Sequence, residues 1–381
     1  MKKIVITTIL LATITLSYGL KFLKVYEIEK QEQNYMEEQI SNYLNGMSLE
    51  EKIGQMLMIS NRTPTMTSEL NTTLNHVKPG GFIFFAENFT NQENSKKLIK
   101  DINDTAKIPM LLSIDQEGGR VQRIKSQNDI IVTDIPPMSE IGATNDFKKA
   151  YEVGVTIGTD LKTFGLNMNF APVLDVLTNT ENKSILGRSF GNNITIVSEM
   201  GINVANGLKS TGIIPTYKHF PGHGSTTVDS HYELPVLTKT KEELWESDLI
   251  PFQNAIHNQA EVIMIGHLAI PNITNNSIPS SLSKEIITDL LKNELNYKGI
   301  VITDALNMKA ITKYYSESQI YEMAINAGVD ILLMPEHPEM AINMIKDSIE
   351  KGKIKESQIN DSVKKIITLK YKYLDFLKTM E

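Results

Sequence analysis

The stretch of this sequence richest in reactive side chains is KHFPGHGSTTVDSHYELP, at residues 218–235. It holds three of the seven histidines of the chain, His219, His223 and His231, together with Asp229. A carboxylate two residues from a histidine can hold the imidazole ring on a turn, fix its tautomer and raise its basicity. Asp229 and His231 are therefore a candidate orienting residue and general base.

The same residues allow a second chemistry, in which a metal ion is bound. His219, His223, Asp229 and His231 would offer it nitrogen and oxygen ligands, which makes a metal-dependent hydrolase an alternative. Pro221 and Gly222 between the first two histidines, and Gly224 after them, exclude the helical i, i+4 pair of H-E-x-x-H zinc sites. A solvent-exposed loop without chemistry is the third interpretation.

Eight short apolar runs recur along the rest of the chain, and these must position any site. They are 54–60, 81–85, 109–114, 166–172, 212–217, 261–266, 299–303 and 329–334. Each is rich in Ile, Val, Leu, Phe or Met, as is typical of strands buried on both faces. Amphipathic segments typical of helices lie between them, at 146–164, 194–210, 241–258 and 283–295.

This alternation predicts an α/β fold with a parallel sheet, and eight repeats predict a (β/α)8 TIM barrel. We expect it to be a single catalytic domain over residues 47–381. An open doubly wound sheet is the alternative architecture. The sequence has no G-x-G-x-x-G after any of these runs, which counts against a dinucleotide-binding fold.

In such a barrel, catalytic groups follow the carboxyl ends of the strands. Polar residues stand at these places after the third to seventh runs. They are Asp115, Gln116 and Glu117, then Asp175, then Lys218 and His219, then His267, and finally Asp304. Since so many ionisable groups coincide with strand ends, we expect a site there.

Composition excludes several classes of protein. The formal net charge is −7 and no long basic run follows the first residues, so nucleic acid is not an expected partner. The chain has no cysteine, which excludes disulfides, thiolate zinc sites and a cysteine nucleophile. We expect neither a metal nor a cofactor.

The first 24 residues differ from the rest. Lys2 and Lys3 precede an uncharged apolar stretch, residues 4–20. Its length lies between the apolar core of a signal peptide and a membrane span. We expect residues 1–24 to be a signal peptide or membrane anchor, and 25–46 a polar linker or helix. The protein would then be exported, either extracellular or tethered to the outer face of the cytoplasmic membrane. A buried N-terminal helix of the fold is the alternative.

Four motifs together resemble glycoside hydrolase family 3, in its single-domain β-N-acetylglucosaminidase branch. They are SIDQEGGRVQR (113–123), GRSFG (187–191), KHFPGHGSTTVDSH (218–231) and GIVITDAL (299–306). The resemblance spans roughly residues 46–340. It implies a retaining exo-β-N-acetylglucosaminidase acting, as a monomer, on peptidoglycan fragments or chitooligosaccharides through a covalent glycosyl-enzyme.

The resemblance also implies roles for individual residues. Asp304 would be the nucleophile, His231 the acid/base and Asp229 the residue that orients it. Substrate binding would fall to Asp115, Arg123, Arg188, Lys218 and His219. Arg120, Glu117, His223 and His267 are secondary candidates. Without the motifs, Asp304 could equally be a helix N-cap, Arg120 and Glu117 a structural ion pair, and His267 a core histidine.

Besides the metal-dependent hydrolase, two other functions remain open from the sequence. A phosphorylase would use phosphate in place of water, which a neutral histidine repels less than a carboxylate does. A non-catalytic sugar-binding protein at the cell surface is the alternative outside enzymes. A β-glucosidase of the same family is disfavoured, because that branch commonly takes its acid/base residue from a second domain and we expect none here.

Overall fold

The computed structural model describes residues 26–226, 230 and 233–377 of the chain. The chain divides into two units, Met1–Met47 and Ser48–Glu381. In the first unit, residues 26–45 form a helix. The predicted export segment, residues 1–24, lies outside the described residues. Among those that are described, no helix combines the length and apolar character needed to cross a membrane.

The second unit is built on short parallel strands, and each of the eight predicted apolar runs contributes to one. Six strands form one sheet in the order β11-β1-β2-β3-β6-β7, and three form another in the order β10-β9-β8. The bounds are β1 (Leu57–Ser60), β2 (Gly81–Phe84), β3 (Leu111–Ile114), β6 (Met168–Asn169), β7 (Ile214–Pro215), β8 (Tyr217–Phe220), β9 (Val262–Ile265), β10 (Ile300–Thr303) and β11 (Leu332–Leu333). An antiparallel hairpin, β4 (Gln116–Gly118) and β5 (Val121–Gln122), follows β3.

Backbone hydrogen bonds connect the two sheets at both junctions. The Thr303 N–H donates to the carbonyl of Ile331 (3.1 Å), which links β10 to the chain entering β11. At the other junction β7 continues into β8, and the Lys218 N–H donates to the carbonyl of Pro172 (3.1 Å) beyond β6. Every residue of β2, β3, β8, β9 and β10 is buried, as expected when both faces of a parallel sheet are covered.

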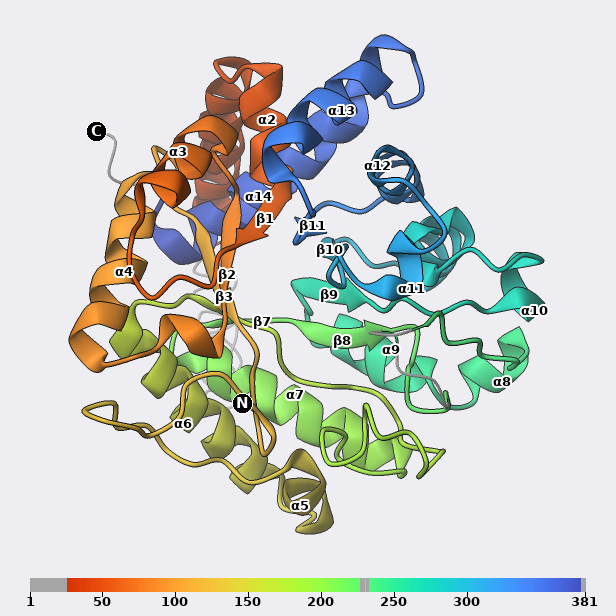
Figure 1. The fold of residues 1–381 in the computed structure, drawn as a ribbon. Coiled ribbons are helices and arrows are strands. Elements are labelled where there is room, and N and C mark those ends of the chain that lie inside the picture. Colours follow the sequence, from red (N-terminus) through yellow and green to blue (C-terminus); the bar gives the residue numbers. More distant parts are fainter. Residues whose placement is uncertain (1–25, 227–229, 231–232, 378–381) are drawn as a thin grey trace, which may run out of the picture. The chain divides into compact units, whose positions relative to one another are not determined.

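Helices lie between successive strands, and Figure 1 shows them on the outside of the sheets. The α-helices are α2 (Leu49–Met56), α3 (Ser68–Val77), α4 (Gln92–Asp104), α5 (Met138–Ala143), α6 (Phe147–Phe164), α7 (Ile194–Ser210), α8 (Lys241–Trp245), α9 (Leu249–His257), α10 (Pro271–Thr274), α11 (Lys309–Thr312), α12 (Glu317–Ala327), α13 (Pro338–Glu350) and α14 (Glu356–Leu374). Two 3-10 turns, η1 (Ala86–Asn88) and η2 (Ser280–Leu282), and a π-helix, η3 (Glu285–Glu294), complete the set. The predicted parallel α/β architecture is confirmed.

Two of the predicted helices, 146–164 and 194–210, are found as α6 and α7. The predicted helix at 241–258 is instead divided into α8 and α9. Pro251 explains the break, because the ring of a proline inside a helix clashes with the carbonyl four residues earlier, here that of Ser247. The fourth prediction, at 283–295, is helical but forms the π-helix η3.

Helices α6 and α7 pack closely because each presents a glycine to the backbone of the other. A Cβ atom on Gly154 would lie 2.1 Å from the carbonyl oxygen of Val204. One on Gly207 would lie 2.2 Å from the carbonyl oxygen of Tyr151. Only residues without a side chain fit this contact.

Candidate active site

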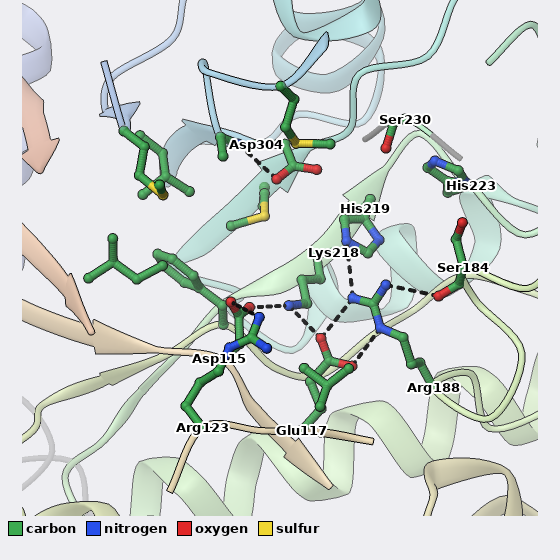
Figure 2. A pocket seen from close by; sticks show the side chains of 18 of the residues that line it. Asp115, Glu117, Arg123, Ser184, Arg188, Lys218, His219, His223, Ser230 and Asp304 are labelled. Carbon is green, nitrogen blue, oxygen red and sulfur yellow. Dashed lines mark hydrogen bonds and ion pairs between the residues drawn. The ribbon is translucent and has the colours of Figure 1, made fainter. Parts of the chain in front are cut away.

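A pocket of about 490 Å³ lies at the carboxyl ends of the strands. Its volume is in the usual range for small-molecule sites. Six residues that the sequence assigned to catalysis or substrate binding line it, as Figure 2 shows: Asp115, Arg123, Arg188, Lys218, His219 and Asp304. The structure therefore brings together side chains that are up to 189 positions apart in the sequence.

The strands position these groups much as predicted, with one correction. Asp115 directly follows β3 and Asp304 directly follows β10. Lys218 and His219 do not follow the fifth strand but lie within β8, which pairs with β9. Their polar character made the segment resemble a loop, whereas their backbone continues the sheet.

Asp304 is held by its own backbone neighbour. The Ala305 N–H donates to Oδ1 of Asp304 (2.8 Å), and the Asp304 N–H donates to the carbonyl of Ile265 (2.9 Å). Burial by itself would raise the pKa of Asp304, but the nearby His267 and His219 and the Ala305 hydrogen bond hold the pKa below its ordinary value. Asp304 is thus ionised at neutral pH.

The alternative role of Asp304 as a helix N-cap is wrong. The next helix, α11, begins at Lys309, and its N-cap residue is Met308. The carboxylate of Asp304 faces the pocket (Figure 2).

Five charged residues form a continuous array on another wall of the pocket (Figure 2). Arg188 binds Glu117 through two hydrogen bonds of 2.8 Å. The Lys218 ammonium lies 2.6 Å from Glu117 and 2.8 Å from Asp115. Arg123 closes the array at 3.1 Å from Asp115. We call these residues the charged array.

The charged array fixes the ionisation of its carboxylates. Burial would raise the pKa of Glu117, but Arg188 and Lys218 outweigh it and lower the pKa to about 2. Burial would also raise the pKa of Asp115, but Lys218 and Arg123 outweigh it and hold that pKa below its ordinary value. Neither residue can hold a proton at neutral pH, so neither can act as a general acid.

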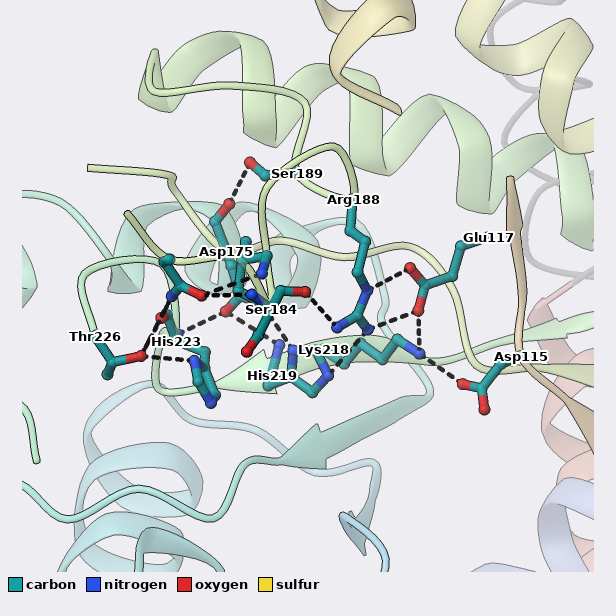
Figure 3. A network of polar contacts seen from close by, with 12 residues as sticks. Asp115, Glu117, Asp175, Ser184, Arg188, Ser189, Lys218, His219, His223 and Thr226 are labelled. Atoms are coloured by element: carbon teal, nitrogen blue, oxygen red, sulfur yellow. Dashed lines mark hydrogen bonds and ion pairs between the residues drawn. The ribbon is translucent and has the colours of Figure 1, made fainter. Parts of the chain in front are cut away.

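Asp175 orients His219 from behind the pocket (Figure 3). Its Oδ2 lies 2.7 Å from Nδ1 of His219, and its Oδ1 accepts the backbone N–H of His223 (2.7 Å). The contact places the ring proton on Nδ1 and leaves Nε2 toward Arg188, 3.5 Å from its Nη2. Burial would raise the pKa of Asp175, but His219 holds it below its ordinary value.

Asp175 was predicted only by its place after a strand, without a role. One signal could have found it. Asp175 stands inside the apolar run APVLDVL (171–177), and a carboxylate buried in such a run needs a charged or hydrogen-bonding partner.

The secondary candidates have different outcomes. The alternative ion pair of Arg120 with Glu117 is wrong, because Arg120 donates to the backbone carbonyls of Lys183 (2.5 Å) and Ser184 (2.6 Å). His223 lines the pocket, with Nδ1 2.9 Å from the Thr226 hydroxyl, and burial lowers its pKa. His267 is fully buried, and its Nε2 donates to the carbonyl of Ala305 (2.9 Å).

His231 and Asp229 lie outside the described residues. Ser230, which stands between them in the sequence, lines the pocket (Figure 2). The metal site proposed from His219, His223, Asp229 and His231 therefore stays a prediction. In the described part of the chain, the acidic and histidine side chains close enough to share an ion are Glu317, Glu336 and His337. None of these lines the pocket.

Residues 48–369 match the family described as the glycosyl hydrolase family 3 N terminal domain. The chain belongs to glycoside hydrolase family 3. The family predicted from the four motifs is confirmed.

Curated relatives and solved structures agree with this membership. Beta-hexosaminidase A of Pseudoalteromonas piscicida is 33% identical over 81% of this chain and 56% of its own length. Beta-hexosaminidase of Nitrosomonas eutropha is 32% identical over 76% of this chain and 83% of its own length. A glycoside hydrolase family 3 beta-N-acetylglucosaminidase from Paenibacillus is 34% identical, with a TM-score of 0.82 over 86% of this chain and 63% of that one. The chain thus spans little more than half of the Pseudoalteromonas relative.

Proposed function

We propose that this protein is a retaining exo-β-N-acetylglucosaminidase that releases terminal N-acetylglucosamine from peptidoglycan fragments or chitooligosaccharides. Asp304 carries the proposal, since it is an ionised carboxylate facing a pocket whose other two described carboxylates are tied to cations. The names of the relatives support the choice of sugar. We also propose that the two sheets form one closed (β/α)8 barrel, which the hydrogen bonds at both junctions support.

Asp304 would attack the anomeric carbon of the sugar. Its Oδ1 already accepts the Ala305 N–H, which leaves Oδ2 as the attacking oxygen. The carbon–oxygen bond to the leaving group breaks while the bond to Oδ2 forms, and water later hydrolyses this glycosyl-enzyme, so configuration is retained.

A general acid must protonate the leaving oxygen, and the described carboxylates of the pocket do not suit this role. Asp304 is the nucleophile, and the cations of the charged array keep Asp115 and Glu117 ionised. We propose His231 as the acid and then the base, with Asp229 orienting its ring. A histidine titrates near neutral pH and can both donate and accept the proton.

The charged array would bind the sugar. The Lys218 ammonium has three N–H donors. Two of them bind Asp115 and Glu117, so one is left for a sugar hydroxyl. Asp115 has further lone pairs to accept hydroxyl protons, and Nε2 of His219 faces the same space. Because these groups are already held in place, substrate binding requires little reorganisation of the protein.

The first experiment is an assay of the full chain on 4-nitrophenyl β-N-acetylglucosaminide, with Asp304→Asn beside it. We expect turnover in the wild type and a loss of at least about 10³-fold in the variant. Exposed Asp361→Asn on α14 is the matched control and should keep full activity. NMR of the first released sugar should show the β-anomer.

Other outcomes would point elsewhere. Activity that survives Asp304→Asn, or an α-anomer as first product, would contradict the mechanism. Release of sugar 1-phosphate only when phosphate is added would identify a phosphorylase, and no turnover under either condition would favour a sugar-binding protein.

We propose that the protein is exported and held at the outer face of the membrane through residues 4–20. The basic start and uncharged stretch of the sequence support this. Fractionation of cells that express the full chain tests it, because recovery in the cytosolic fraction would contradict export.

A further inference from the structure

Arg123 is one of the proposed substrate-binding residues, yet its hydrogen bonds alone hold its side chain loosely. Its guanidinium donates one hydrogen bond, to Asp115 (3.1 Å), and its Nε–H is buried without a hydrogen-bond partner among the described residues. Arg188, by contrast, donates two hydrogen bonds to Glu117 and a third to the carbonyl of Ser184 (3.1 Å). A single hydrogen bond leaves a guanidinium free to turn, whereas a bidentate pair fixes its plane.

The ring of Phe85 gives Arg123 a second contact. Phe85 directly follows β2 and lines the pocket. The central guanidinium carbon of Arg123 lies over this ring, 5.7 Å from its centroid. A guanidinium within about 6 Å of an aromatic face is attracted by the ring quadrupole. The ring therefore restricts the rotation that the single hydrogen bond to Asp115 permits.

A second arginine lies over the same ring. The guanidinium carbon of Arg62, from the loop after β1, is 4.1 Å from the Phe85 centroid. Arg62 also pairs with Glu87 at 2.5 Å, and Glu87 stands two residues after Phe85. The side chain of Arg62 is 56% exposed, so these two contacts are what hold it against the ring. We call Arg62, Phe85 and Arg123 the aromatic stack.

Asn88 joins the two loops that carry Arg62 and Phe85. Its side chain is buried, and its Oδ1 accepts the N–H of Phe85 (2.8 Å). Its amide nitrogen donates to the carbonyls of Asn61 (2.9 Å) and Thr63 (2.7 Å), the residues on either side of Arg62. A buried amide whose hydrogen bonds are satisfied in this way fixes the backbone that it contacts. The ring is thus held in place before any sugar binds.

We propose that Phe85 is a positioning residue for substrate binding, which holds Arg123 in place beside Asp115 for the terminal sugar. The inference rests on the proposed function, because it takes that sugar as the ligand of Arg123. Figure 2 shows Arg123 and Asp304 on different sides of the pocket, so Arg123 would contact the sugar away from the reacting carbon. Such a contact stabilises bound substrate and transition state equally, and its loss raises KM while kcat is kept.

Steady-state kinetics of the full chain on 4-nitrophenyl β-N-acetylglucosaminide test the inference. Phe85→Leu keeps an apolar side chain but removes the aromatic face. We expect KM to rise about fivefold or more, with kcat within about twofold of the wild type. Phe85→Tyr keeps the aromatic face, so its KM should stay at the wild-type value.

A double-mutant cycle shows whether Phe85 acts through Arg123. Arg123→Ala should itself raise KM, and adding Phe85→Leu should raise KM no further, because the side chain that the ring holds is gone. Phe89→Leu is the matched control. Phe89 is buried and packs on the rings of Phe84 and Phe164, so its loss should lower the midpoint of urea denaturation and leave KM unchanged.

Arg62→Met tests the aromatic stack from its exposed side and serves if Phe85→Leu does not fold. We expect a rise in KM of about twofold or more, and no rise when Arg123 is already alanine. An unchanged KM in Phe85→Leu, or an equal rise with and without Arg123, would overturn the inference and leave the proposed function intact. No turnover by the wild type would instead overturn the proposed function, and the inference with it.

Discussion

At the scale of single residues, the three described carboxylates of the pocket differ in their partners: two form ion pairs with cations, and the third does not. Asp115 and Glu117 each contact Lys218, and an arginine completes the partners of each. Within the described residues, Asp304 accepts a backbone N–H on one oxygen, and His267, His219 and Lys218 lie nearby. The two paired carboxylates are suited to hold a substrate, and the third to react with it.

This division leads to a prediction for His231→Ala. If His231 protonates the leaving oxygen, the fall in activity of His231→Ala should be larger for leaving groups that need a proton to depart. We expect kcat/KM to fall about 100-fold or more on an N-acetylglucosaminyl disaccharide, and less than about tenfold on the 2,4-dinitrophenyl glycoside. Steady-state kinetics on both substrates measure it.

Exposed His257→Ala, at the end of α9, is the control and should change neither value. An equal loss on both substrates for His231→Ala would mean that the residue does not act as the acid.

Residue types at strand ends predicted Asp115, Lys218, His219 and Asp304 in the pocket, whereas Arg123 and Arg188 were assigned only through the resemblance to the family. Neither argument predicted how these side chains pair. Asp304, Lys218 and His219 were found because ionisable groups at strand ends are informative. The partner of Glu117 was missed, since Arg188 is 71 residues away and nearby Arg120 was the simpler guess. Pairing across loops is decided by packing, which short-range sequence patterns do not contain.

At the scale of elements, hydrophobic runs predicted where strands form more reliably than where they end. β8 continues through Lys218, His219 and Phe220 because its backbone pairs with β9, whatever its side chains are. Similarly, Pro251 divides the predicted helix at 241–258, so α9 is a separate helix. The amphipathic pattern of that segment does not show this effect.

The glycine contact between α6 and α7 gives a prediction that opposes intrinsic helix preference. In an isolated helix, replacing glycine by alanine stabilises by about 1 kcal/mol. Gly154→Ala should instead destabilise the protein by about 1–3 kcal/mol, because the added methyl group meets the Val204 carbonyl. Urea denaturation measures the change.

Thr159→Ala, on the exposed side of the same helix, is the control and should be neutral or slightly stabilising. A Gly154→Ala protein as stable as the Thr159→Ala protein would show that α6 and α7 can separate without cost.

At the scale of the whole molecule, one buried lysine links stability to pH. Lys370 of α14 is fully buried, and its hydrogen-bond partner is the amide oxygen of Gln55 on α2 (2.7 Å). Burial lowers its pKa to about 7. An unfolded lysine titrates near 10.4.

Between about pH 7 and pH 10, the unfolded chain therefore holds a proton at Lys370 that the folded protein does not. Raising the pH removes this advantage of the unfolded chain, so the free energy of unfolding should rise across that window by roughly 4 kcal/mol. Below pH 7 both states are protonated and the gain is absent. Lys370→Met should remove this part of the slope and leave the smaller contribution of Lys292, whose pKa burial lowers to about 8.

Urea denaturation at several pH values between 6 and 10 tests it, with exposed Lys364→Met on the same helix as control. A Lys370→Met protein whose stability keeps the wild-type dependence on pH would contradict the assignment.

The charged array also has a consequence for how such sequences can diverge. Its members come from the loop after β3, the hairpin that follows, the segment before α7 and strand β8, and each neutralises the next. Loss of Glu117 would leave Arg188 without its carboxylate partner, and loss of Asp115 would do the same to Arg123, which proteins tolerate poorly where the charge is buried. Changes here should therefore be inherited together, so the pocket is expected to evolve more slowly than the helices around it.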